Sequence, residues 1–372
     1  MKEELPLWAE IDLGAIRRNV EAVRRLLKPE TKLLSVVKAN GYGHGDVQVA
    51  KAAVAAGSDW LGVARVEEGA TLRTAGVTQP ILLLAEPPLG AVERAIGLDL
   101  VPTLYSEPVA RAFSKKAAAS NRSVTVHMKV DTGMHRYGVL PERALSFFKM
   151  LRDLDGIDVR GIWSHFAAAE NEGDEYTRQQ YESFIDVLGE LNGAREGLMK
   201  HMANSAATVA FPNAHFDMVR CGIVIYGIHP APELEGRIHL EPAMTLKSRV
   251  GFVKRLAAGE SLSYGRRYFT SKPTNVATVP YGYADGLTRA LSNKGEVLIR
   301  GRRYPICGAI TMDHFLVDVG DDEVASGDEV VIMGKQLSGE ITAQEIANLL
   351  DTIPYEIVCA VSSRVPRIYI GA

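Results

Sequence analysis

The sequence predicts an α/β fold class: an N-terminal (β/α)8 TIM barrel over residues 1–235, followed by a mostly β C-terminal domain over residues 236–372. Two patterns support this. Eight short apolar runs alternate with helical patterns over the first 230 residues, and shorter alternating strands replace them beyond about residue 235. Eight strands is the number in a TIM barrel. A doubly wound open sheet is the alternative, but it binds its ligand at one switch point instead of on many strand ends.

The predicted barrel strands are short and rich in aliphatic or β-branched residues, as strands buried on both faces should be. They cover residues 33–37, 60–64, 81–84, 100–104, 124–130, 157–163, 198–202 and 218–225. Helical patterns such as 46–56, 141–154 and 175–191 separate them, and Gly57 marks a helix end. An initial helix over Leu13–Leu27, with Asp12 as its N-cap, precedes the first strand.

The C-terminal part has a different pattern. The polar segment PAPELEGR is the predicted connector, and short strands separated by glycine- and aspartate-containing turns follow it. These strands cover residues 245–253, 275–280, 296–299, 303–307, 315–319 and 329–333. Thr342 and Glu345 form a capping-box pattern, which predicts a helix over the apolar residues that follow.

Composition excludes several classes of protein. With 47% hydrophobic and 23% charged residues the chain is globular, and a net charge of −3 gives no field for nucleic acid or a membrane surface. Cys221, Cys307 and Cys359 are 86 and 52 residues apart, which fits neither a disulfide framework nor a metal knuckle. The nine histidines show no metal-binding spacing, so we expect no metal. Without a signal-like or membrane-spanning apolar run, we expect a cytoplasmic protein.

The first barrel strand ends in the segment VVKANGYGHG, which places Lys38 directly after a buried run. Desolvation there would favour the neutral, nucleophilic amine. Gly41, Gly43 and Gly45 allow the backbone to approach a ligand closely. The segment is therefore a candidate ligand site, and the alternative is a glycine-rich loop with a solvent-facing lysine.

This segment and eight others, in the same order, resemble those of the alanine racemases, pyridoxal-phosphate enzymes of fold-type III. The other eight are KVDTGMHRYG (129–138), WSHFAAAE (163–170), NSAA (204–207), VRCGIVIYG (219–227), LSYGRRY (262–268), PYGYADG (280–286), CGAITMDHFLVDV (307–319) and RVPRIY (364–369). The resemblance covers nearly the whole chain. It implies a homodimer that binds pyridoxal 5′-phosphate at Lys38, interconverts L- and D-alanine, and supplies D-alanine for peptidoglycan.

The resemblance also assigns the cofactor contacts. The implied cofactor-binding residues are Lys38, Tyr42, His165, Ser205, Arg220, Gly222, Ile223 and Tyr355. Several follow predicted barrel strands, where barrel enzymes build active sites, and Ser205, Gly222 and Ile223 lie where such barrels bind phosphate. Tyr42 and Tyr355 would contact the phosphate through their hydroxyls. The alternative for both tyrosines, and for His165, is an ordinary core side chain.

Arg220 bears on the type of reaction. In similar enzymes it faces the pyridine nitrogen, and a guanidinium donates a hydrogen bond there but gives up no proton. The cofactor ring is then a weaker electron sink, which favours racemisation over transamination or decarboxylation. Without the resemblance, an arginine within a strand would be a buried ion-pair partner.

Racemisation needs proton-transfer groups on opposite faces of Cα, and the resemblance supplies Lys38 and Tyr264. Tyr264 belongs to the β domain, so we expect it to enter the partner subunit's barrel; otherwise it is a turn tyrosine. The resemblance also implies that Arg136 and the backbone N–H of Met312 bind the substrate carboxylate, and the β domain would contribute Met312, like Tyr264, to the partner's active site.

The resemblance implies supporting roles for three further residues. Asp313 would orient the site, and the alternative is that it is an ordinary turn aspartate. Tyr283 would limit substrate size at the entrance. Lys129 would carry a carbamate that holds Arg136 in place. Cys307, near the same loop, is interpreted as a structural thiol.

Three other functions remain as alternatives. A racemase of the same fold with broader specificity would also act on serine, lysine or arginine. A non-catalytic pyridoxal-phosphate carrier would lack the C-terminal domain, and a decarboxylase of related fold is disfavoured by Arg220.

Overall fold

The computed structural model describes residues 5–170, 173–191 and 197–371, which form two compact units. The barrel unit comprises Ala15–Gly41 and Asp46–Glu241. The β unit comprises the residues up to Gly14, Tyr42–Gly45 and the chain from Pro242 onward. The β unit therefore includes two N-terminal segments in addition to the C-terminal part of the chain.

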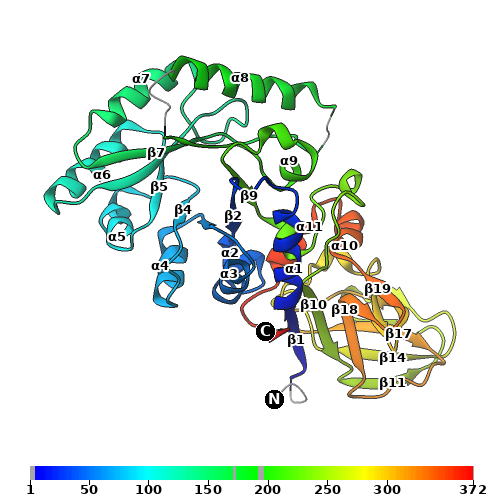
Figure 1. Cartoon of the computed structure of the whole chain (residues 1–372). Helices are drawn as coiled ribbons and strands as arrows, with labels where there is room; N and C mark the ends of the chain where they lie inside the picture. Colours follow the sequence, from blue (N-terminus) through cyan, green and yellow to red (C-terminus); the bar gives the residue numbers. More distant parts are fainter. Residues whose placement is uncertain (1–4, 171–172, 192–196, 372) are drawn as a thin grey trace. The chain divides into compact units, whose positions relative to one another are not determined.

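The barrel unit contains eight parallel strands in the order β8-β7-β6-β5-β4-β3-β2-β9 (Figure 1). They are β2 (Lys32–Val36), β3 (Trp60–Val63), β4 (Ile81–Leu83), β5 (Val101–Leu104), β6 (Val124–Lys129), β7 (Ile157–Trp163), β8 (Met199–His201) and β9 (Met218–Cys221). Backbone bonds from Asp217 N to Lys200 O and from Arg220 N to Ala203 O, both 3.0 Å, join the two end strands. The predicted (β/α)8 barrel is confirmed.

Helices cover this sheet, and Figure 1 shows α4 to α8 along its outer side. They are α1 (Leu13–Arg24), α3 (Asp46–Ala55), α4 (Val66–Thr74), α5 (Val92–Gly97), α6 (Glu107–Ala119), α7 (Pro141–Arg152), α8 (Glu175–Leu191) and α9 (Ser205–Ala210). The face of α8 that carries Phe184, Val187 and Leu188 is buried, as the helical period predicts. The last predicted strand is shorter than expected, because Gly222 leaves the extended conformation and the 3₁₀ helix η5 (Ile223–Tyr226) follows.

The β unit contains a sheet in the order β11-β14-β17-β16-β15-β18-β10-β1-β20, with β19 beside β18, and a separate pair, β12-β13. The strands are β1 (Leu7–Asp12), β10 (Met244–Arg249), β11 (Phe252–Leu256), β12 (Ser261–Leu262), β13 (Tyr268–Phe269), β14 (Thr274–Val279), β15 (Glu296–Ile299), β16 (Arg302–Cys307), β17 (Phe315–Gly320), β18 (Glu329–Gln336), β19 (Gly339–Ile341) and β20 (Arg367–Ile370). The single strand predicted over 245–253 is wrong. Val250 N bonds to Asp328 O and Gly251 N to Thr278 O, so the chain changes partners between β10 and β11.

Two α-helices in the described part of the chain also belong to this unit. The predicted N-cap is confirmed, because Thr342 Oγ1 accepts a 3.0 Å bond from Glu345 N at the start of α10 (Ala343–Leu350). The reciprocal bond of a capping box is not formed between these two residues, because the Glu345 carboxylate pairs with Arg303 instead. The sequence analysis did not anticipate α11 (Pro354–Ala360) or β1. β1 pairs antiparallel with β10 and parallel with β20, and its Trp8 and Ile11 side chains are fully buried. No helix in the described part of the chain is long and apolar enough to cross a membrane.

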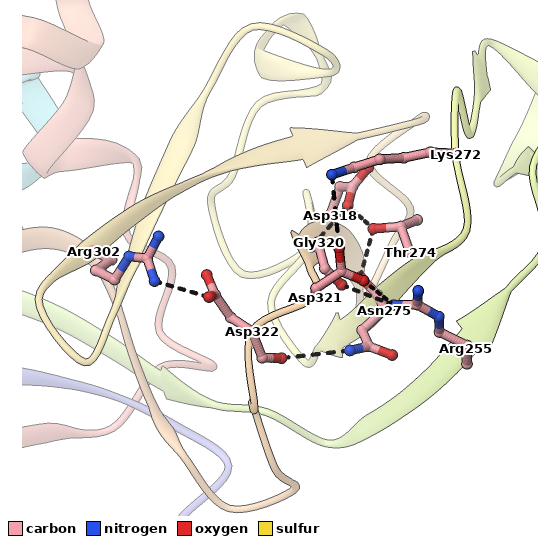
Figure 2. A network of polar contacts seen from close by, with 9 residues as sticks. All are labelled: Arg255, Lys272, Thr274, Asn275, Arg302, Asp318, Gly320, Asp321 and Asp322. Atoms are coloured by element: carbon pink, nitrogen blue, oxygen red, sulfur yellow. Dashed lines mark hydrogen bonds and ion pairs between the residues drawn. The ribbon is translucent and has the colours of Figure 1, made fainter.

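A polar network joins β14 and β17 at one end of this sheet (Figure 2). The Asp318 carboxylate accepts a short bond from the Thr274 hydroxyl, a 3.1 Å bond from Gly320 N and a 2.6 Å bond from the Tyr268 hydroxyl. Burial alone would raise the pKa of Asp318, but these donors outweigh it and hold the pKa below its usual range. The ionised carboxylate therefore connects three strands.

Asp318→Asn should destabilise the β unit by about 1–2 kcal/mol, because the amide cannot accept every hydrogen bond of the half-buried carboxylate. A carboxyl whose pKa is lower in the folded state than in the unfolded state stabilises the fold when the pH lies above its unfolded-state pKa. This stabilisation is lost as the pH falls through the folded-state pKa. The difference in thermal unfolding between variant and wild type should therefore shrink below about pH 4. Asp321→Asn, in an exposed ion pair with Arg255, is the control and should change stability by less than about 0.5 kcal/mol. Equal effects of the two substitutions would contradict this role of Asp318.

Candidate active site

Lys38 follows β2 and begins a short turn, α2 (Lys38–Tyr42), in the left-handed conformation. Ala39, Asn40 and Gly41 have φ of 53°, 54° and 58°, and Tyr42 has φ of 51°. For residues other than glycine this conformation costs roughly 1–2 kcal/mol each. Glu68 Oε1 compensates by accepting a 2.7 Å bond from Ala39 N. Strained backbone of this kind clusters at functional sites, and it persists only where surrounding contacts, such as the bond to Glu68, hold it.

Lys129, at the end of β6, is only 2% exposed, and its ammonium lies 4.4 Å from the Trp163 ring centroid. Burial, followed by the charges of Arg220 and Arg136, lowers the pKa of Lys129 to about 7. A substantial fraction of this amine is therefore neutral near pH 7. Arg136 itself is exposed, in the loop after β6.

Arg220, in β9, is 3% exposed and has no carboxylate among its partners in the described chain. Its Nη1 donates to His201 Nδ1 (3.0 Å), and its Nη2 contacts the carbonyls of Ser164 and Met202 and His165 Nδ1 at 2.8–3.0 Å. The interpretation as a buried ion-pair partner is therefore wrong for the described residues. No hydrogen bond between described residues uses Nε, so this N–H can donate to a ligand.

The buried guanidinium remains positively charged near neutral pH. Burial lowers the pKa of Arg220, but only to about 9. Burial and then the charge of Arg220 lower the pKa of His165 well below its usual value, so this imidazole is neutral. The pair thus provides one fixed cation hydrogen-bonded to a neutral ring at the end of β7.

The predicted phosphate contacts in the barrel unit lie together. Ser205 is the first residue of α9, follows the N-cap Asn204, and is 5% exposed. Its Oγ accepts a 2.9 Å hydrogen bond from Gly222 N. Ile223 begins η5, and backbone N–H groups in the first turn of a helix have no partner within the helix. Ser205, Gly222 and Ile223 therefore form one polar corner after β8 and β9.

Tyr42 and Tyr355 meet within the β unit, 313 positions apart in the sequence. Their ring centroids are 6.1 Å apart, with planes inclined by 47°. Tyr42 is 8% exposed and Tyr355, on α11, is half-buried. Burial, followed by the proximity of Tyr355 and Cys359, raises the pKa of Tyr42, so its hydroxyl stays protonated and can donate to an anion.

The β unit also gathers Tyr264, Tyr283, Met312 and Asp313. Tyr283 N donates to Thr311 O (3.0 Å), and the Arg364 guanidinium bonds to Asp313 Oδ1 at 2.8 Å. The Ser263 hydroxyl donates a 2.6 Å hydrogen bond to Ala309 O. This bond places the turn that carries Tyr264 against the loop that carries Met312 and Asp313. Tyr264 is 76% exposed, Met312 52% and Tyr283 44%. Three large side chains thus lie in solvent on one loop cluster.

Two of the three cysteines are buried and unreactive. Burial raises the pKa of both Cys221 and Cys307 to about 12, which leaves them inert thiols. Cys359 is exposed. Among the described residues, no group of three histidine, cysteine, aspartate or glutamate side chains is placed to hold a metal ion.

His201 and His127 were not among the predicted site residues. Both are buried on barrel strands, and His201 contacts Arg220 directly. A single histidine in an apolar strand is ordinarily a core residue, so the sequence pattern gave no signal for either residue. Only the proximity of strands distant in the sequence brings them to the site.

Both units match known proteins. Residues 11–230 match the family model of the alanine racemase N-terminal domain, and residues 243–369 match that of the alanine racemase C-terminal domain. An alanine racemase of Symbiobacterium thermophilum is 48% identical over 368 residues, covering 98% of this chain and 97% of that protein.

Solved structures agree with these matches. The alanine racemase of Clostridium difficile 630 has a TM-score of 0.94 at 39% identity, covering 98% of this chain and 96% of that one. The alanine racemase of Bartonella henselae, with covalently bound pyridoxal phosphate, has a TM-score of 0.87 at 30% identity, covering 98% of this chain and 99% of that one. The similarity thus extends over both units.

Proposed function

The chain belongs to the alanine racemase family, and from this premise we propose that it interconverts L- and D-alanine with pyridoxal 5′-phosphate, by two-base proton transfer at Cα. The observation that carries the proposal is Arg220, a buried cation without a carboxylate partner in the described chain, in the same barrel as Lys38. D-Alanine made in this way would supply peptidoglycan synthesis.

The residues of the barrel unit fit this cofactor. Lys38 offers an amine, and Arg220 Nε offers an N–H donor that makes no hydrogen bond to another described residue. Ser205 and Gly222 offer a hydroxyl and adjacent backbone for the phosphate. The resemblance also assigns Tyr42 of the β unit, whose hydroxyl stays protonated, to the phosphate. Pyridoxal phosphate, when bound, acidifies the Cα–H of an amino acid and accommodates the electron pair left by the departing proton.

Arg220 would bind the pyridine nitrogen without protonating it. A guanidinium with a pKa of about 9 remains charged at pH 7 and keeps its protons, so it donates a hydrogen bond only. With the cofactor bound, the electron pair would stay closer to Cα, where Lys38 or Tyr264 would return a proton. An aspartate in this position would favour other reactions of the same cofactor.

Lys38 would exchange a proton at one face of Cα, and Tyr264 of a second subunit at the other face. The exposure of Tyr264, Met312 and Tyr283 on one loop cluster supports this, because a homodimer would cover them. Arg136 of one subunit and the Met312 N–H of the second subunit would hold the substrate carboxylate. Tyr283 would restrict the side chain to about the size of alanine, while the ion pair of Arg364 with Asp313 steadies the loop.

The decisive experiment maps the cofactor. After borohydride reduction of the protein loaded with pyridoxal phosphate, mass spectrometry should locate the label on Lys38, and Lys38→Ala should carry none. Racemisation of alanine should exceed that of serine, lysine and arginine. Label on another lysine would refute the site, and faster racemisation of the larger amino acids would refute the substrate.

Lys129→Ala should lower racemase activity by about tenfold or more. The neutral fraction of Lys129 can add carbon dioxide, and the resulting carbamate anion would hold Arg136 where two cations would otherwise repel each other. Small carboxylic acids should partly restore the variant, and ¹³C-labelled carbon dioxide should give a carbamate signal only in the wild type. Lys51→Ala, on exposed helix surface, is the control. A fully active Lys129→Ala variant would show that the carbamate has no role.

A further inference from the structure

Three side chains from β6, β8 and β9 form a continuous hydrogen-bonded chain within the barrel unit. Arg220 Nη1 lies 3.0 Å from His201 Nδ1, and His201 Nε2 lies 2.9 Å from His127 Nδ1. His127 is 1% exposed, His201 is fully buried and Arg220 is 3% exposed. The chain thus extends from the proposed cofactor contact into the protein interior.

The chemistry of the donors determines where each proton lies. A guanidinium can only donate, so His201 Nδ1 must accept and carries no hydrogen. A neutral His201 then has its hydrogen on Nε2 and donates it to His127 Nδ1. His127 must in turn carry its hydrogen on Nε2. Burial, followed by the charge of Arg220, lowers the pKa of His127 to about 3 and that of His201 well below its usual value, which agrees with two neutral rings.

The surrounding side chains hold both rings in place. Trp163 stacks on His201, with planes inclined by 11° and centroids 5.6 Å apart, and Trp60 packs against His127 at 5.4 Å. Gly161 in β7 leaves the space for His127, because a Cβ there would lie 2.5 Å from the ring atoms Cγ and Nδ1. Neither ring can rotate without displacing an aromatic neighbour or the backbone.

The hydrogen-bonded series ends at His127 Nε2. This atom is buried and has no hydrogen-bond partner among the described residues. An unsatisfied buried donor is unfavourable, so packing alone would favour a hydrocarbon side chain at this position. The useful atom of His127 is therefore Nδ1, the acceptor for His201.

We propose that His127 is a positioning residue: by accepting from His201 it selects the tautomer that leaves Nδ1 open to Arg220, and so orients the guanidinium toward the cofactor. This rests on the proposed function of Arg220. If His127 did not accept a hydrogen bond from His201, the hydrogen of His201 could lie on Nδ1. Two N–H donors, those of His201 and Arg220, would then face each other without an acceptor. Arg220 would then lose one of the bonds that fix its plane.

The test compares His127→Asn with His127→Leu. The two side chains have nearly the same shape and leave the same space, but only asparagine offers an acceptor near the position of Nδ1. The kcat of alanine racemisation should fall about tenfold or more in His127→Leu, with KM nearly unchanged, and should remain close to wild type in His127→Asn. Equal activities of the two variants, whether low or unchanged, would overturn the proposal.

Neutron diffraction from the deuterium-exchanged wild type is the second readout and does not depend on activity or on folding of a variant. Deuterium should appear on His201 Nε2 and His127 Nε2 and should be absent from both Nδ1 atoms. Deuterium on either Nδ1 would overturn the proposal. If the wild type does not racemise alanine, the proposed function fails, whereas this measurement still decides the tautomers.

Discussion

Tyr264→Phe is expected to slow alanine racemisation by about 10²–10⁴-fold in both directions, the usual effect of losing a positioned acid or base. The substitution keeps the ring and removes only the hydroxyl. Each turnover needs one group on each face of Cα, and the equilibrium constant between enantiomers is fixed near one. Loss of one group must therefore reduce both directions alike.

Exchange of the α-hydrogen with solvent deuterium separates the two faces. If Lys38 removes the α-proton of D-alanine and Tyr264 that of L-alanine, the variant should still exchange the α-hydrogen of D-alanine for deuterium. It should no longer exchange that of L-alanine. Tyr268→Phe, four residues further on, removes a hydroxyl that bonds to Asp318 and should affect stability but not exchange. Near-normal racemisation by Tyr264→Phe, or equal loss of exchange for both enantiomers, would defeat the two-base assignment.

Lys38→Ala should abolish racemisation, because it removes both the attachment point of the cofactor and one of the two bases. Its more informative use is in combination. If Tyr264 enters the partner's barrel, a heterodimer of Lys38→Ala and Tyr264→Phe chains contains one site with both defects and one site with neither. Mixing the two inactive proteins under conditions of subunit exchange should therefore restore activity, approaching one quarter of the wild-type value when the chains assort at random.

The control for this mixture is each variant alone, taken through the same exchange procedure. A mixture that stays inactive, although mass spectrometry detects heterodimers, would show that both groups act within one chain. The measurement thus tests the shared site separately from the chemistry.

Prediction from sequence succeeded where the signal is local. The barrel strands are apolar runs whose burial is evident from composition, and the Thr342 cap depends on a contact three residues away. β1 has no such signal, because its partners β10 and β20 lie more than 230 residues further along the chain. The interruption at Val250 and Gly251 likewise depends on two separate partner strands.

The same limit applies to the site. Glycines in the segment after Lys38 indicated close approach of the backbone, but the left-handed turn also includes Ala39 and Tyr42, which do not favour positive φ. Arginine within a strand suggested an ion pair, whereas the partners of Arg220 are imidazoles and carbonyls from β8 and from the residues that follow β7 and β8. Both features are set by the folded surroundings.

The pairing of β1 with β10 and β20 also has a consequence for how the chain is made. During synthesis Leu7 leaves the ribosome 237 residues before Met244, the first residue of β10. At about 5–20 residues per second this interval lasts roughly 10–50 s. Throughout it the nascent chain carries an apolar strand, with Trp8 and Ile11, whose neighbours do not yet exist. The barrel sequence is complete first, and the strand that precedes it must be kept from aggregating until the last segment of the chain arrives.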